Sequence, residues 1–149
     1  MTAPALWVLL GLFLLRVVGQ ALLGLGVLRA GGRLPPWDEW YSGLLPYPWL
    51  LLSQVAILAL LVKVSFDVTR GDGYFARPNR RLGRALLAFG MLYALGMVVR
   101  YLLRGSLSIP IVFHWVLAGY LLILGVYHLR EAAAWYPARS PQPPRNPWS

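Results

Sequence analysis

Four long apolar runs dominate the chain, and shorter segments rich in Gly, Pro and charged residues separate them. A helical membrane span needs about 20 mostly apolar residues. The runs meet this length and predict spans at about 5–28, 48–68, 82–103 and 109–129. Apolar residues are continuous within each run rather than alternating with polar ones, which favours helices over strands. The sequence therefore predicts an all-α fold, a four-transmembrane-helix bundle.

Two segments at the ends of the chain need separate interpretation. The first run has no basic stretch before it and is interrupted by Arg16, so we expect a retained helix rather than a cleaved signal peptide. The segment 137–149 is rich in proline and polar residues, a composition typical of disorder or of polyproline II structure. We therefore expect a membrane domain over 1–136 and a disordered tail over 137–149.

The composition agrees with a membrane protein and excludes several kinds of site. The chain has 149 residues, of which 58% are hydrophobic and 13% charged, whereas soluble domains carry about 25% charged residues. It has no cysteine, so disulfides, thiolate metal sites and a cysteine nucleophile are excluded. The net charge of +9 is explained by basic residues that meet anionic lipid at the cytoplasmic face, so we do not infer nucleic-acid binding.

The distribution of basic residues predicts an orientation, because cytoplasmic loops carry an excess of Lys and Arg. The loop before the third span and the start of that span hold basic residues that we expect to contact anionic lipid, namely Arg70, Arg77, Arg80, Arg81 and Arg84. The segment after the fourth span adds Arg130, Arg139 and Arg145. The opposite side carries Arg29, Arg33, Arg100 and Arg104, partly offset by Asp38 and Glu39. Both termini are therefore expected in the cytoplasm.

The first outer loop is unusually aromatic. The segment 33–49 contains residues whose rings favour the membrane interface, among them Trp37, Trp40, Tyr41 and Trp49. Such rings have one apolar and one polar end, so they sit at the depth of the lipid head groups. We expect a short amphipathic segment lying in the outer interface. The alternative is a docking surface for a partner subunit, because Trp and Tyr also dominate interface hot spots.

The loop between the second and third spans carries a motif. The residues Gly73-Tyr-Phe75-x-x-x-Asn79-x-x-Leu82 resemble an uncharacterised family of small four-helix bacterial membrane proteins, which carry Gly-x-Phe-x-x-x-Asn at this place. This chain lacks a Ser or Thr helix cap after Phe75, and Pro78 is expected in the first turn of the following helix. The resemblance implies a multi-pass protein of the bacterial inner membrane, with no established activity.

Polar residues inside the spans are costly in lipid and are therefore the main candidates for function. Arg16 lies near the middle of the first span, and Gln20 follows one turn later on the same face. We expect these two residues to form one polar cluster in the bundle interior with Gln54, Tyr93 and Tyr120. The cluster either satisfies Arg16 by itself, or a lipid, an anionic or quinone-like ligand or a neighbouring chain supplies the counter-charge. Asp67 lies near the cytoplasmic end, where we expect it to pair with Lys63.

The fourth span holds both histidines of the chain, His114 and His128. Together with Ala118, Leu121 and Gly125 they follow a helical face, and the two rings are about 21 Å apart along it. The spacing resembles that of two-haem cytochromes of the b type. Each haem would need a second histidine, however, which this chain does not contain. We therefore expect no haem and no other cofactor, and two polar residues near the two interfaces.

These patterns favour a protein without a catalytic site. Our first hypothesis is a small polytopic membrane protein that serves as an accessory or structural subunit of a membrane complex, with a membrane-protein partner or a second copy of itself. The alternative is a haem- or quinone-linked redox module that uses His114 and His128, or Arg16. A transporter is less favoured, because the chain lacks internal repeats and intramembrane acids. A hydrolase lacks a paired nucleophile and base, and no metal-ligand cluster is evident.

Overall fold

The computed structural model describes residues 2–26, 46–105 and 108–135. The described part is entirely helical. It contains α1 (Thr2–Gly24), α3 (Tyr47–Arg70), α4 (Arg80–Arg104) and α5 (Ile109–Trp135). Each of these four helices is long and apolar enough to cross a membrane. The chain therefore has the architecture of a multi-pass membrane protein, as its apolar runs predict.

The helix ends differ from the expected spans by a few residues. Helix α1 ends at Gly24, and Gly26 then adopts the left-handed conformation with φ of 71°. Helix α5 continues to Trp135, past the expected limit at 129, because its last two turns contain Glu-Ala-Ala-Ala, which are strong helix formers. The aromatic loop falls outside the described residues up to residue 45, and the tail does so from residue 136.

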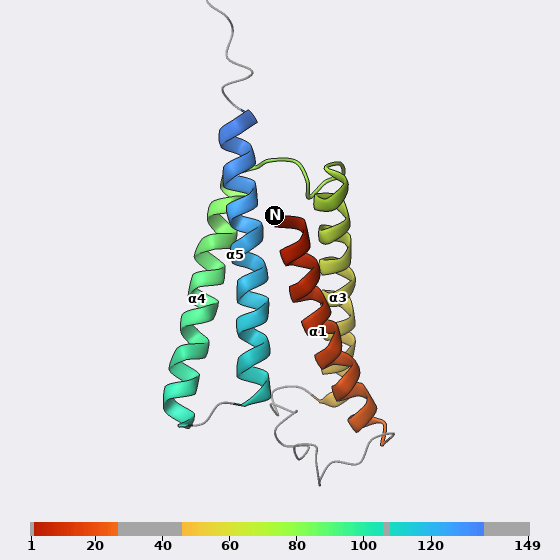
Figure 1. Cartoon of the computed structure of the whole chain (residues 1–149). Helices are drawn as coiled ribbons and strands as arrows, with labels where there is room; N and C mark the ends of the chain where they lie inside the picture. The colour runs from red at the N-terminus through yellow and green to blue at the C-terminus, as the bar shows by residue number, and fades with distance from the viewer. Residues whose placement is uncertain (1, 27–45, 106–107, 136–149) are drawn as a thin grey trace, which may run out of the picture.

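The four helices form an open row. Close packing joins α4 to α5, α5 to α1, and α1 to α3, and no other pair of the described helices packs in this way. Figure 1 shows two antiparallel hairpins, α1 with α3 and α4 with α5, that meet where α1 lies beside α5. Helices α3 and α4 are thus the two ends of the row, and the backbone of each lies close to that of one other described helix.

Large apolar side chains fill the junction between α1, α3 and α5. On α1 they recur every three or four residues, which places them on one side of the helix: Leu6, Leu10, Phe13 and Val17. Helix α3 contributes Leu61, Val64 and Val68, and α5 contributes Tyr120 and Leu124. Helix α4 contributes none of the buried residues of this cluster, although its Leu86 packs against it. It packs on α5 through glycines instead, and Gly83 and Gly90 are its buried residues.

Asp67 organises the loop between α3 and α4. The expected ion pair with Lys63 is present, and the other carboxylate oxygen accepts a hydrogen bond from the Phe75 N–H at 3.2 Å. Gly73 has φ of 90°, and a Cβ atom there would lie 2.5 Å from the carboxyl carbon of Asp67. Gly73 and Phe75, two residues of the recognised motif, therefore fold the loop back onto the end of α3.

Asn79, the third residue of the motif, starts α4. Its side-chain oxygen accepts hydrogen bonds from the N–H groups of Arg81 at 2.9 Å and Leu82 at 3.1 Å, which is the usual role of an N-cap. Pro78 precedes this cap, so its expected place in the first turn was wrong. The chain needs no Ser or Thr cap because Asn79 already satisfies two free N–H groups.

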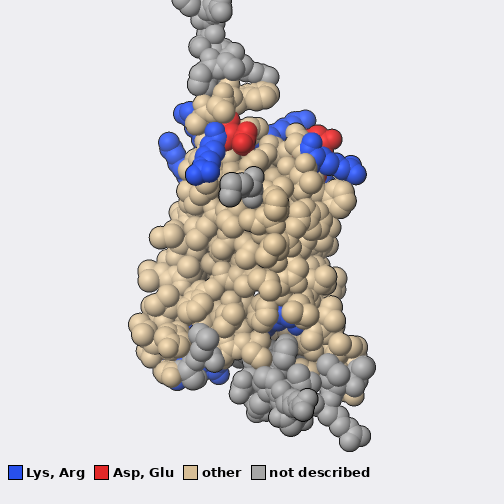
Figure 2. Space-filling model, viewed as in Figure 1, with Lys and Arg blue, Asp and Glu red and all other residues tan. Residues whose placement is uncertain are grey.

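Charged side chains gather at one end of the molecule, and a broad uncharged band separates them from the other end (Figure 2). The ends of the described chain, Thr2 and Trp135, lie toward the charged end together with the loop between α3 and α4 (Figure 1). The arginines of that loop and the adjoining helix turns are Arg70, Arg77, Arg80, Arg81 and Arg84, and Arg130 lies near the end of α5. Arg100 and Arg104 lie in the last turns of α4, at the opposite end.

Candidate functional site

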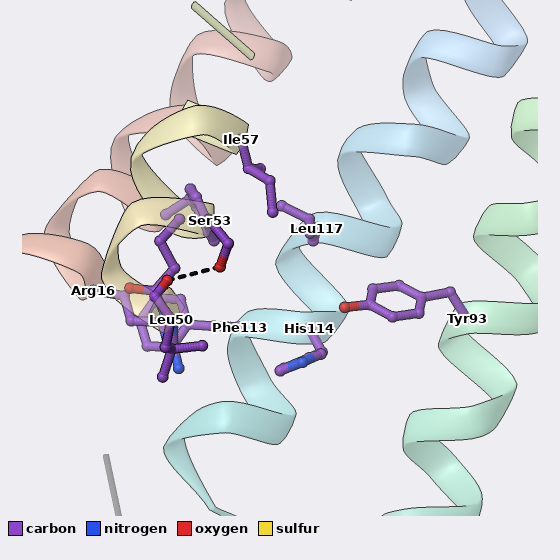
Figure 3. A pocket seen from close by; sticks show the side chains of 10 residues that line it. Arg16, Leu50, Ser53, Ile57, Tyr93, Phe113, His114 and Leu117 are labelled. Carbon is purple, nitrogen blue, oxygen red and sulfur yellow. Dashed lines mark hydrogen bonds between the residues drawn. The ribbon is translucent and has the colours of Figure 1, made fainter. Parts of the chain in front are cut away.

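A pocket of about 160 Å³ is lined by residues of all four described helices (Figure 3). Its lining residues are Phe13 and Arg16 of α1, Leu50, Ser53, Gln54 and Ile57 of α3, Tyr93 of α4, and Phe113, His114 and Leu117 of α5. Phe13, Arg16 and Gln54 form a deep wall and are 5 to 6% exposed, whereas Ile57 is 37% exposed. The pocket is therefore deep on the α1 side and accessible from the side of α3.

Arg16 is the charged group of this pocket. Its side chain is 6% exposed, and no atom of the described residues accepts a hydrogen bond from its Nε–H. The guanidinium carbon lies 5.8 Å from the centre of the Phe113 ring, a weak cation–π contact. An arginine keeps its positive charge inside a protein. Arg16 therefore occupies an apolar environment that compensates its charge poorly.

Acidic side chains of the described residues lie far from Arg16. Asp67 is near the end of α3, Asp72 is in the following loop, and Glu131 is near the end of α5, and all three belong to the end where α1 begins. Arg16 lies fourteen residues after Thr2, about 21 Å along α1. No described carboxylate is thus placed to neutralise the guanidinium.

Gln20 and Gln54 join α1 to α3 beside the pocket. The Gln54 Nε2 group donates to Oε1 of Gln20 at 3.0 Å, and the Tyr47 hydroxyl donates to the backbone carbonyl of Gln20 at 3.3 Å. Both glutamine side chains are buried, and Oε1 of Gln54 has no donor. The pocket wall therefore offers a buried acceptor as well as the donors of Arg16.

Tyr93 and His114 form the opposite side of the pocket. Their ring centres are 5.6 Å apart, and Tyr93 reaches from α4 toward α5 (Figure 3). The Nδ1–H of His114 donates to the carbonyl of Pro110, one turn earlier on α5. That bond leaves Nε2 of a neutral His114 as an acceptor.

Tyr120 is separate from this group of polar residues. Its hydroxyl is 2.9 Å from the Ser65 hydroxyl and donates to the Leu61 carbonyl at 2.9 Å. It lies six residues beyond His114 on α5, about 9 Å closer to the charged end. The five residues expected in one cluster therefore do not all lie together. Arg16, Gln54 and Tyr93 line the pocket, and Gln20 binds Gln54 beside it. Tyr120 lies apart from them and joins α5 to α3.

The two histidines also lie in different environments. His128 is fully buried beside Tyr127, with ring centres 5.4 Å apart. It interacts with the backbone of Arg77, although neither ring nitrogen has the geometry of a hydrogen bond to a described atom. Gly125 lies between His114 and His128 along α5. Helix α4 covers it, because Leu87 and Gly83 of α4 lie against Gly125. Helix α4 therefore occupies the space beside Gly125.

No protein-family model, curated protein or solved structure matches this chain. Evidence for the function of this chain therefore comes from the geometry of the pocket and of the helix surfaces.

The sequence did not point to some residues that line the pocket or join α4 to α5. Ser53 and Phe113 line the pocket, and neither has a signal in the sequence beyond its neighbours Gln54 and His114. Gly83 and Gly90 were also missed, although a seven-residue spacing puts two glycines on one helix side. Of the expected aromatic docking residues, Trp49 is 65% exposed in the first turn of α3, and Trp37, Trp40 and Tyr41 lie outside the described residues.

Proposed function

We propose that the chain is a non-catalytic membrane protein that serves as an accessory or structural subunit of a membrane complex. The observation that carries this proposal is the exposed side of α4. This helix packs closely on α5 alone among the described helices, and its residues other than Gly83 and Gly90 are half-buried or exposed.

The exposed side of α4 is suited to another membrane helix. It carries three small residues, Ala85, Ala88 and Gly96, and a Cβ atom at Gly96 would meet nothing within 4 Å. Apolar exposure by itself says little in lipid, because lipid tails are as apolar as leucine. Small residues do carry information, since they allow two helix backbones to approach closely.

The charge distribution supports the proposed orientation, with both termini in the cytoplasm and the aromatic first loop at the outer interface. The basic end would then meet the anionic lipid of the cytoplasmic leaflet through Arg70, Arg77, Arg80, Arg81 and Arg84. The Gly73–Asn79 motif supports the proposal of a bacterial inner-membrane protein of the family that it resembles.

A matched pair of glycine substitutions tests the partner surface. Gly96 on α4 and Gly11 on α1 are both exposed, and neither has an atom within 4 Å of its Cβ position. In affinity purification from mild detergent, Gly96→Leu should lower recovery of the partner roughly tenfold, the effect of about 1.4 kcal/mol. Gly11→Leu should leave recovery unchanged. Equal recovery with both variants, or a wild-type chain that purifies alone, would refute the proposal.

The second candidate is a quinone-linked redox module, which is favoured by the presence of Arg16 and His114 in one pocket. A quinone carbonyl could accept a hydrogen bond from the guanidinium. Solvent extraction of the purified protein, followed by chromatography for quinones, tests this function. A stoichiometric quinone that Arg16→Gln removes would support it, and extracts without quinone would refute it.

A further inference from the structure

We propose that the Arg16 pocket is a binding site for the anionic head group of a lipid, whose acyl chain leaves the pocket between α3 and α4. The inference goes beyond the proposed subunit role and does not depend on it. It rests on an uncompensated charge, on the shape of the pocket and on the gap in the helix row.

The charge of Arg16 calls for an anion. The side chain lines the pocket and is 94% buried, as its exposed fraction of 6% shows. Its Nε–H has no acceptor among the described residues, and its guanidinium carbon lies 5.8 Å from the centre of the Phe113 ring. An unpaired charge in a low-dielectric site is strongly unfavourable, and a carboxylate or phosphate oxygen forms strong charge-assisted hydrogen bonds with a guanidinium.

The pocket has room for such a group. Its volume is about 160 Å³, and a cavity of about 150 Å³ is large enough to hold benzene. Besides Arg16, the lining includes Gln54, whose buried Oε1 has no donor among the described residues. A hydroxyl on the head group would satisfy this oxygen while the anionic oxygen binds the guanidinium.

The route for an acyl chain follows from the open row. Helices α3 and α4 do not pack together, yet residues of both line the pocket, Ile57 from α3 and Tyr93 from α4. Ile57 is an apolar lining residue and is 37% exposed, so we place the mouth beside it, on the α3 side. An anion attached to a hydrocarbon chain fits this mouth better than a free, hydrated ion, because the chain stays in lipid.

Thermal unfolding of delipidated protein in neutral detergent tests the site. Dioleoyl-phosphatidylglycerol should raise Tm by about 5 °C or more at saturation, and oleate should also raise it, because both combine an oxyanion with an acyl chain. Dioleoyl-phosphatidylcholine and inorganic phosphate should have little effect. An equal shift with phosphate alone would refute the acyl part of the proposal, and a shift with phosphatidylcholine or decyl-ubiquinone would refute the requirement for an anion.

Variants connect the shift to Arg16. Arg16→Gln should abolish it, and Arg100→Gln, the same change toward the same end of the molecule but outside the pocket lining, should leave it intact. If Arg16→Gln fails to fold, Ile57→Trp provides a second test, because it blocks the mouth and keeps the arginine. A full lipid response in Ile57→Trp, or in Arg16→Gln where it folds, would overturn the proposal.

The acidic residues of the first loop provide the remaining alternative. If Asp38 and Glu39 supplied the counter-charge, the double variant Asp38→Asn/Glu39→Gln would lower Tm in lipid-free detergent as much as Arg16→Gln does. The proposed site predicts instead that this variant keeps the wild-type Tm and the full response to phosphatidylglycerol. Native mass spectrometry should also show one lipid adduct per chain that Arg16→Gln loses.

Discussion

Gly83 of α4 and Gly125 of α5 face each other so closely that a Cβ atom on either would lie 3.0 Å from the carbonyl oxygen of the other. The obstacles include a leucine side chain on each side and this backbone oxygen, which cannot move aside like the end of a flexible side chain. Gly90 extends the same contact toward Leu122, with a Cβ atom there 3.0 Å from the nearest leucine carbon. Because these glycines have no side chains, α4 can pack closely on α5, as is common between membrane helices.

Substitution of Gly83 should loosen this contact. We expect Gly83→Ala to destabilise the protein by about 1–3 kcal/mol, the usual cost of overpacking. Gly96→Ala adds the same methyl group to the same helix in open space, so it should be neutral or stabilising by up to about 1 kcal/mol. Thermal unfolding in detergent measures both variants. Equal stability would show that α4 and α5 do not approach as closely as the structure has them.

Tyr120 should contribute to stability through its hydroxyl, which bonds Ser65 and the Leu61 carbonyl. Removal of this group in Tyr120→Phe should cost about 0.6–1.7 kcal/mol, the range for hydrogen bonds between membrane helices. Tyr101→Phe is the matched control, because Tyr101 is 37% exposed. In the double variant with Ser65→Ala the two losses should not add. Strict additivity would mean that the two hydroxyls do not interact.

Asp67 should hold the loop between α3 and α4 in place, since it binds Lys63 and the Phe75 N–H. We expect Asp67→Ala to speed tryptic cleavage after Arg70 by roughly threefold or more, because local opening exposes this bond. Asp72→Ala changes an exposed acid in the same loop and should leave cleavage unchanged. Identical digestion rates in the two variants would mean that other contacts hold this loop in its conformation, such as the hydrogen bond from Tyr127 to Ala76.

The proposed orientation predicts which side of the membrane each loop faces. The chain has no cysteine, so a single one can be introduced at Ser42 or at Asp72. An impermeant thiol reagent applied to intact cells should label position 42, and position 72 should react after the cells are opened. Labelling of position 72 alone in intact cells would invert the orientation.

Purified protein should show no Soret absorption. His114 donates to Pro110 and packs against Tyr93, His128 is enclosed beside Tyr127, and α4 covers Gly125 on the face between them. His114→Ala should therefore leave the absorption spectrum and the assembly unchanged. A Soret band at about one haem per chain that both histidine substitutions abolish would establish the redox alternative.

Much of this architecture is determined by the sequence alone. A membrane span requires a minimum apolar length, so the four runs predict the four helices. Local contacts are equally readable, because they depend on spacing along one helix: Lys63 and Asp67 pair at i and i+4. Asn79 is adjacent to the N–H groups that it caps, although its role as the cap was not recognised.

Tertiary structure decided which helix faces meet. In water, the apolar stripe of a helix identifies its buried side, but in a membrane both lipid and protein interior are apolar, and the stripe loses this meaning. The positions of Arg16, Gln54, Tyr93 and Tyr120 along their helices therefore predict one cluster, and only the fold shows that Tyr120 binds Ser65 instead of lining the pocket. The pocket itself exists because four helix surfaces, remote in sequence, leave space around one arginine, and no pattern along a single helix specifies that space.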